Sequence, residues 1–216
     1  MDRTLERVQL LDNARVIQIE RFLNHPVNEV WAALTEPQRL SDWLANAQIE
    51  LSKGGKLELR FDNTGAVVRG TVTDVKAPNI LEYTWDSQQV PQNLPAPARS
   101  ADERAEDDAH SITLLQGSKI RWELKPAEGG GTVLTLTHSA GSPPVPAAAR
   151  ERGSWLSADP QREPHDQPHI VIASWNEHLN QLDIALDSPG RNARREATWD
   201  WTRWEGLRSK YARTLG

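Results

Sequence analysis

The stretch HIVIASWNEHLNQLDIALDS, residues 169–188, contains the most regular pattern in the chain. Apolar side chains recur in it every three or four residues, which indicates a long amphipathic helix. Such a helix needs an apolar surface to cover. The apolar face should hold Val171, Trp175, His178, Leu179, Leu182 and Leu186. The polar face should hold Asn176, Glu177, Asn180, Gln181 and Asp183.

The rest of the chain supplies that surface as strands. Alternating and β-branched runs predict strands over 14–23, 49–51, 56–61, 66–78, 79–86, 119–126 and 132–139. The links between strands are short after the first one, so these strands should pair as antiparallel neighbours. The apolar face of such a sheet must be covered, and among the predicted elements the long helix is large enough to cover it. The predicted fold class is therefore α+β, with a curved antiparallel sheet that grips the long C-terminal helix.

Two short helices should follow the first strand. Asn24 is the expected cap of the first helix, and Thr35 is the expected cap of the second. Pro26 and Pro37 fall in the first turns, where proline is tolerated. The second helix places Trp43 near the expected mouth of the space between sheet and long helix.

Two proline-rich stretches, 87–110 and 141–168, interrupt the regular elements. They hold few large apolar side chains and should form long loops or insertions. A last helix is predicted over 199–214, with Trp201, Trp204, Leu207 and Tyr211 in one stripe. We therefore expect one domain over 1–216, with a core of about 14–187, these two insertions and a helical extension over 188–216.

Several motifs resemble activator-of-heat-shock-protein-90-ATPase-like domains, which belong to the START / birch-pollen-allergen-like (SRPBCC) superfamily. The motifs are IERFLNHPVNEVWAALTEPQRLSDW (19–43), LEYTW (81–85), LTLTHS (134–139) and WNEHLNQL (175–182). The resemblance covers about 14–86, 117–141 and 169–187. It implies a helix-grip fold with a cavity between sheet and helix, which relatives use for lipids, hormones or polyketides. Ser174 stands where the family usually has Gly, and both insertions are longer than the family norm.

Strand alternation predicts which side chains point into the space between sheet and helix. The candidate ligand-binding residues are Arg21, Trp43, Leu57, Leu59, Phe61, Tyr83, Trp85, Trp122, Leu124, Leu134, Leu136, His138, Trp175, His178, Leu179 and Leu182. An apolar strand face is usually plain core, and that alternative stays open. The polar atoms of Trp, Tyr and His favour a partly wet cavity instead.

Two of these residues have alternative roles. His138 either lines the cavity or bonds a neighbouring backbone carbonyl. Arg21 would anchor a ligand carboxylate, or pair with a protein acid at the rim, because a buried guanidinium needs a partner. His138 with Tyr83 or Glu82 is the arrangement that general acid–base chemistry would require.

Composition excludes several classes of function. The chain has 216 residues and no Cys, so disulfides, thiolate metal sites and cysteine catalysis are excluded. A net charge of −5 argues against nucleic acid and anionic membranes as partners. We expect no metal and no cofactor, since His165 and His169 are separated by Pro168 and lie at the second insertion. Without an apparent signal peptide, the expected location is the cytoplasm.

Three functions remain open. The first is a non-enzymatic binder of a small hydrophobic molecule of lipid or polyketide type. The second is a cyclase-like or hydrolase-like enzyme that uses the same cavity. The third, implied by the family name, is a chaperone partner in stress response, although 216 residues leave no room for the extra N-terminal domain of full-length activators. The tryptophan stripe of the last helix either docks on the body or forms a homodimer contact, and its basic residues alternatively suit an acidic partner.

Overall fold

The computed structural model describes residues 6–11, 16–61, 66–89, 117–139, 168–188 and 200–215. Within these ranges nine strands form one antiparallel sheet in the order β1-β2-β9-β8-β6-β5-β4-β3, and β7 pairs with β5. The strands are β1 (Glu6–Leu11), β2 (Val16–Leu23), β3 (Asn46–Ile49), β4 (Lys56–Arg60), β5 (Val67–Lys76), β6 (Ile80–Trp85), β7 (Ser87–Gln89), β8 (Ser118–Pro126) and β9 (Thr132–Ser139). The helices are α1 (Val27–Thr35), α2 (Pro37–Trp43), α4 (Pro168–Asp187) and α6 (Trp201–Leu215).

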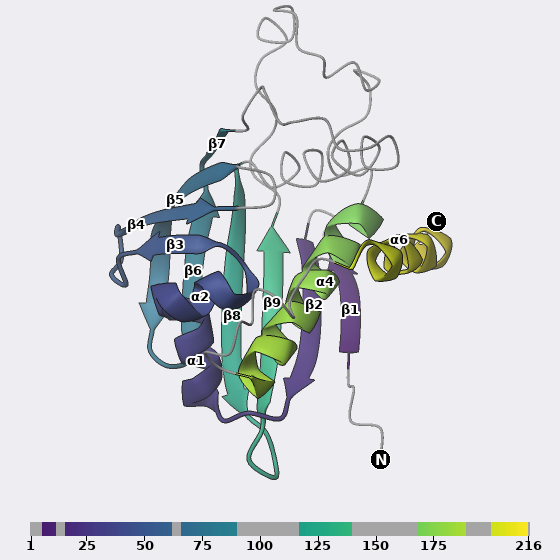
Figure 1. The fold of residues 1–216 in the computed structure, drawn as a ribbon, viewed down its shortest axis with the longest axis horizontal. Coiled ribbons are helices and arrows are strands. Elements are labelled where there is room, and N and C mark those ends of the chain that lie inside the picture. Colours follow the sequence, from purple (N-terminus) through teal and green to yellow (C-terminus); the bar gives the residue numbers. More distant parts are fainter. Residues whose placement is uncertain are drawn as a thin grey trace, which may run out of the picture.

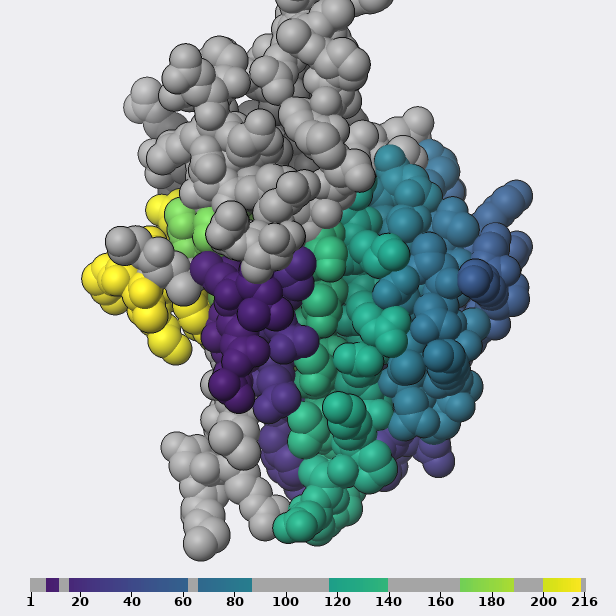
Figure 2. Space-filling model, turned by 180° about the vertical axis from the view of Figure 1, so that it is seen from behind, coloured from purple at the N-terminus to yellow at the C-terminus, as the bar shows by residue number. Residues whose placement is uncertain are grey.

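The helices α1, α2 and α4 cover one face of the sheet, and α4 runs diagonally across it (Figure 1). The opposite face, seen in Figure 2, is open along β9, β8 and the neighbouring strands. α6 packs against α4 and lies beside the β1 edge of the sheet. This arrangement confirms the predicted α+β helix-grip fold, because a sheet with one apolar face is closed by one long helix.

Burial alternates along the strands as the sequence predicts. In β6 the side chains of Leu81, Tyr83 and Trp85 are buried, and those between them are partly exposed. The register aligns the buried residues in rows that run across the strands. One row joins Trp85 to Ser118, the next joins Tyr83, Ile120 and His138, the third joins Leu81, Trp122 and Leu136, and Leu124, Leu134 and Arg21 form the fourth. The rows give the inward face a fixed order from one end of the sheet to the other.

Several local predictions were wrong. Asn24 does not cap α1, which begins at Val27 with Pro26 at the N-cap. Thr35 does not cap α2, because it is the last residue of α1 and its hydroxyl donates to the Trp31 carbonyl at 2.7 Å. Glu36 is the N-cap of α2. The strand expected at 49–51 is β3, which lies at 46–49.

Two strands appear where none was predicted. β1 pairs with β2 over its whole length, from Glu6 opposite Arg21 to Leu11 opposite Val16. β7 occupies the first three residues of the predicted insertion 87–110 and pairs with the start of β5. The rest of that insertion, the insertion residues 141–167, and Trp199 at the start of the predicted last helix lie outside the described residues.

The predicted polar face of α4 is the largest departure from expectation. Asn176, Glu177 and Gln181 are buried, although the helical pattern places them away from the sheet. Asn176 and Glu177 are buried where α6 packs on that side of α4, with Trp204 and Tyr211 also buried. α4 is therefore enclosed on two sides, by the sheet on its apolar face and by α6 on part of its polar face.

Candidate functional site

The centre of the inward face is a set of aromatic rings from four elements, α2, β8, β9 and α4. The Trp122 ring of β8 meets the Trp43 ring of α2 edge to face, with 6.1 Å between centroids. It meets the Trp175 ring of α4 in the same way at 5.6 Å. Trp175 also lies against His138 and His178. These five residues are called the aromatic cluster below. They join the sheet to α2 and α4, mainly by edge-to-face packing, the arrangement that aromatic quadrupoles favour.

His138 is held by the helix that covers it. Trp175 Nε1 donates a hydrogen bond to His138 Nδ1 at 3.3 Å, and His138 is buried. Nδ1 therefore lacks a proton in this arrangement, and the neutral ring carries its proton on Nε2. The partner of Nδ1 is thus a side chain of α4.

Two further titratable groups on this face, Tyr83 and His178, are neutral near pH 7. Burial raises the pKa of Tyr83 to about 12, and its hydroxyl accepts a hydrogen bond from Trp122 Nε1 at 3.2 Å. Burial lowers the pKa of His178 to about 4. Desolvation disfavours the charged form of both groups. The inward face around the cluster is therefore polar in places but uncharged.

The pairing of His138 with Glu82 suggested by the sequence does not form. Glu82 lies on the outer face, where its carboxylate accepts from Thr73 Oγ1 at 2.7 Å and from Arg121 Nη1 at 3.1 Å. Its pKa is lowered because the hydrogen bonds from Thr73, Arg121 and Lys119 outweigh desolvation, the largest single effect. Tyr83 shares the inward face with His138, with Ile120 between them in the row.

Arg21 is buried at the far end of the inward face. Its Nη1 donates to Asn180 Oδ1 at 2.8 Å, and its Nη2 donates to Asn176 Oδ1 at 3.1 Å. Amide oxygens of α4 accept these two bonds, and the Arg21 charge also favours the ionised form of Asp183 on the same helix. Asn176 Nδ2 in turn donates to the Tyr211 hydroxyl at 3.2 Å. Arg21 is thus linked through α4 to α6, a connection that strand and helix patterns do not reveal.

The aliphatic candidates form the walls around the aromatic cluster. All are buried on the same interface: Leu57, Leu59, Leu124, Leu134, Leu136, Leu179 and Leu182. Phe61 is buried as well and stacks on Trp85, with centroids 6.2 Å apart and 25° between ring planes. The structure therefore brings the candidate residues together in one buried core between sheet and helices.

The indole N–H groups distinguish the buried tryptophans from one another. Trp43 Nε1 donates to the Ala33 carbonyl at 2.9 Å, and Trp204 Nε1 donates to Ser174 Oγ at 3.1 Å. Trp122 and Trp175 donate to Tyr83 and His138 as described. Trp85 Nε1 is buried and has no acceptor among the described residues. Strand alternation predicted that Trp85 points inward, but only the three-dimensional structure shows that its N–H has no acceptor among the described residues.

A concave surface lies outside the sheet–helix interface. A groove of about 240 Å³ runs between α2 and the strands β3 and β4. It is lined by Pro37, Gln38, Ser41, Asn46, Ala47, Gln48, Glu58 and Arg60. Its charges are paired, since Glu58 binds Arg60 at 2.6 Å and Arg69 at 2.9 Å. Sequence patterns do not predict this groove, because it arises where a helix end meets a sheet edge.

The described residues contain neither a cluster of metal ligands nor a membrane-spanning helix. No three of their His, Asp or Glu side chains converge as metal ligands would. His165 lies outside the described residues, so the pair with His169 is not described. None of the described helices has the length and apolar character needed to cross a membrane.

Known proteins resemble this chain over most of its length. The family model described as Activator of Hsp90 ATPase homolog 1-like protein matches residues 24–187. No curated protein matches significantly. A conserved protein of unknown function from Enterococcus faecalis has a similar structure, with 17% identity, a TM-score of 0.57, and 98% of this chain and 90% of that chain covered.

Two further solved structures share the fold. Protein MLL2253 from Mesorhizobium loti has 20% identity and a TM-score of 0.52, and 82% of this chain and 100% of that chain are covered. The solution structure of CalU16 from Micromonospora echinospora has 18% identity and a TM-score of 0.50, with 95% and 94% covered. At such identities the likeness concerns the fold alone.

Proposed function

The chain belongs to the Activator of Hsp90 ATPase homolog 1-like protein family, and from this premise we propose that it binds a small hydrophobic molecule between the inward face of the sheet and α4. The observation that carries the proposal is the chemical character of that interface. Its residues are apolar and aromatic, yet they include His138, Tyr83 and a tryptophan N–H without a described acceptor. Small-molecule sites combine apolar walls with a few such polar atoms.

The proposed ligand lies at the end of the inward face that Phe61, Trp85 and His138 form. At the opposite end, Arg21 is engaged with Asn176 and Asn180. Around the centre the rings of the aromatic cluster pack on one another, so a ligand there would have to separate them. At the Phe61 end one indole face is stacked and its N–H is unsatisfied, which supports a ligand at that end.

The polar groups on this face favour binding over acid–base catalysis. A general acid or base works best when its pKa lies near the operating pH. The pKa of about 12 for Tyr83 and of about 4 for His178 are both far from neutrality. His138 Nδ1 is already engaged with Trp175, and Glu82 is on the other face. Tyr83, His138 and His178 are therefore suited to orient a ligand rather than to transfer protons.

Mass spectrometry and NMR test the proposal. Freshly purified protein, sprayed under native conditions, should carry an extra small-molecule mass that is lost on collisional activation. Protein stripped of that molecule by unfolding and refolding should then bind 2-acetylnaphthalene, a neutral apolar probe. Amide shifts should change for inward residues such as Leu59, Tyr83 and Leu136. The outward residues Thr135 and Thr137, on the same strand as Leu136, are the internal control. The proposal is wrong if no mass is released and the probe shifts no inward residue.

A further inference from the structure

We infer that the Trp85 indole N–H is the hydrogen-bond donor of this site, and that the ligand is an uncharged apolar molecule carrying an oxygen acceptor such as a ketone or ester carbonyl. This inference rests on the proposed function and specifies the chemistry of its ligand. It starts from the difference between Trp85 and the other buried tryptophans.

Among the described residues, the other fully buried indoles all have acceptors. Trp43, Trp122, Trp175 and Trp204 each donate to an acceptor within the described residues, at distances of 2.9 to 3.3 Å. Trp85 is as deeply buried as these, with 1% of its surface exposed. A buried donor without an acceptor is costly, because it has lost its water and gained nothing in exchange. A ligand oxygen at Trp85 would remove that cost only in the complex.

The position of Trp85 suits a ligand contact. It lies with Ser118 in the last row of the inward face, one row beyond Tyr83 and His138. Phe61 stacks against its ring, which fixes the indole plane and leaves the N–H edge as its polar feature. A donor held in one orientation by packing loses little further freedom when it binds an acceptor.

The charges nearby determine which acceptor fits. A carboxylate would need a cation, and the buried cation that the described residues place on this face is Arg21, in the fourth row from the Trp85 end. Rows along one face are two residues apart, so three row spacings put these residues roughly 20 Å from each other. Tyr83 and His178 are neutral at pH 7, as their pKa values of about 12 and about 4 require. A neutral oxygen therefore suits the Trp85 end better than an anion.

Two matched probes test the inference: 2-acetylnaphthalene, which has a carbonyl, and 2-isopropenylnaphthalene, in which a CH₂ group replaces that oxygen. The readout is the indole N–H region of a proton–nitrogen correlation spectrum, which should hold nine peaks for nine Trp. Trp85→Phe identifies the Trp85 peak by its disappearance, and through-bond assignment of the unmodified protein identifies it independently should that variant not fold. The ketone should move this peak downfield, and the hydrocarbon should not.

Affinities provide the second readout. The unmodified protein should bind the ketone about fivefold to tenfold more tightly than the hydrocarbon, the advantage of one neutral hydrogen bond. Trp85→Phe should bind both probes with equal affinity. Trp204→Phe is the matched control and should keep the preference, because Trp204 lies on α6 and its N–H is already bonded to Ser174.

The outcomes separate the two proposals. If both probes bind equally to the unmodified protein, with no ketone-specific shift at Trp85, the inference about the donor is wrong and ligand binding stands. A preference that persists in Trp85→Phe also contradicts it. If neither probe binds, the proposed function itself fails for neutral naphthalenes, and the inference falls with it.

Discussion

Trp85 and Trp122 point from adjacent strands into one interface, yet their N–H groups have different surroundings. Trp122→Phe removes a hydrogen bond and leaves the Tyr83 hydroxyl without that donor. Trp85→Phe removes a donor that has no acceptor among the described residues. Both changes lose similar ring area. In ligand-free protein, Trp122→Phe should therefore cost about 1 kcal/mol more in the free energy of unfolding than Trp85→Phe. Urea denaturation of the two variants measures this difference, and equal losses would contradict it.

His178 should make the protein sensitive to acid. Its pKa is about 4 in the folded chain, below the ordinary 6.5. As the pH falls from 6.5 to 4, the unfolded chain takes up a proton at this ring and the folded chain does not, so stability falls. The loss should stay below about 3 kcal/mol, because the ring retains some solvent exposure.

The variant His178→Phe tests that pH dependence. It keeps a ring beside Trp175 and removes the titration. Its stability should vary less between pH 6.5 and pH 4 than that of the unmodified protein, as urea denaturation at several pH values would show. A curve parallel to that of the unmodified protein would place the acid sensitivity at another group.

Sequence patterns predicted side-chain direction well and side-chain partners poorly. Alternation placed Leu57, Leu59 and Tyr83 on the buried face because the period of a strand fixes the face. It could not identify the acceptors of Arg21, since these come from a helix 155 or more residues away in sequence. Partners depend on tertiary packing, and one sequence contains no direct record of it.

The docking of α6 on α4 is the element contact that the helical pattern concealed. Glu177 accepts from the Asp200 backbone N–H at 3.1 Å and pairs with Arg203 at 3.3 Å. Desolvation raises the pKa of this buried carboxyl against those two favourable contacts. Periodicity finds the apolar stripe of α4, but it does not show that a later helix with its own polar groups will cover the other side. Ser174, which departs from the family pattern, contributes the acceptor for Trp204.

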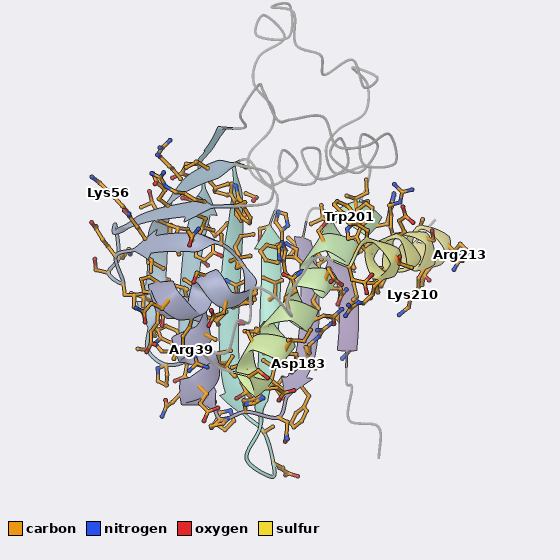
Figure 3. All side chains as sticks on the ribbon, in the orientation of Figure 1. Arg39, Lys56, Asp183, Trp201, Lys210 and Arg213 are labelled. Carbon is orange, nitrogen blue, oxygen red and sulfur yellow. The ribbon has the colours of Figure 1, made fainter. Side chains whose placement is uncertain are left out.

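Tyr211→Phe tests how firmly α6 is held. The change removes the hydroxyl that accepts from Asn176 Nδ2 in a buried setting. It should lower the free energy of unfolding by about 1 kcal/mol and speed amide hydrogen exchange in α6 more than in β8 or β9. Arg213→Ala is the control: Arg213 is exposed, projects from α6 away from the sheet and should matter little (Figure 3).

Gly70 marks where β5 passes from one set of neighbours to another. The C-terminal half of β5 pairs with β6, and the N-terminal half of β5 pairs with β4 and β7. A Cβ atom at Gly70 would overlap the backbone oxygen of Thr84, and backbone cannot easily move away. We expect Gly70→Ala to destabilise by about 3 kcal/mol or more, in the range of severe overpacking.

Gly206 provides the matched control for Gly70. It lies in the interior of α6, and a Cβ there would meet nothing within 4 Å. Gly206→Ala should therefore raise stability by about 0.5–1 kcal/mol, because alanine is the better helix former. Thermal unfolding of both variants should move the midpoint in opposite directions, and movement in the same direction would contradict the explanation by close approach.

β1 was missed for a reason that concerns its place in the sheet. The sequence ERVQLL is short, mixed in charge and has only two partly buried apolar side chains, Val8 and Leu10. An edge strand needs less apolar character than a central one, because only one side is paired. Its strand character comes from pairing with β2, which a local pattern does not report.

The molecule as a whole has two different faces. The outer face carries ion pairs of Arg121 with Asp74, Glu82 and Glu123 at 3.1 to 3.4 Å, as suits a surface in contact with water. The inner face carries the aromatic cluster and its uncharged polar groups. The fold class followed from this division, since alternation reveals it in every central strand. Whether the inner face holds a ligand did not follow, because core and cavity walls use the same residue types.

Ligand binding should show as added stability of the whole chain. A molecule that binds only the folded state at 100 times its dissociation constant adds about 2.7 kcal/mol. With 2-acetylnaphthalene, the thermal midpoint should rise with probe concentration in the unmodified protein and rise less in Trp85→Phe. A midpoint that does not respond to the probe in the unmodified protein would contradict specific binding.

The aromatic cluster also provides an optical record of the assembled fold. Trp43, Trp122 and Trp175 come from α2, β8 and α4, and their rings are held edge to face within 6.1 Å of one another in pairs. Indole rings that are held rigidly in asymmetric surroundings give strong near-ultraviolet circular dichroism. This signal disappears when packing loosens, even if helices and strands persist. One absorption band in the near ultraviolet thus reports, without any label, whether three separate elements are in contact.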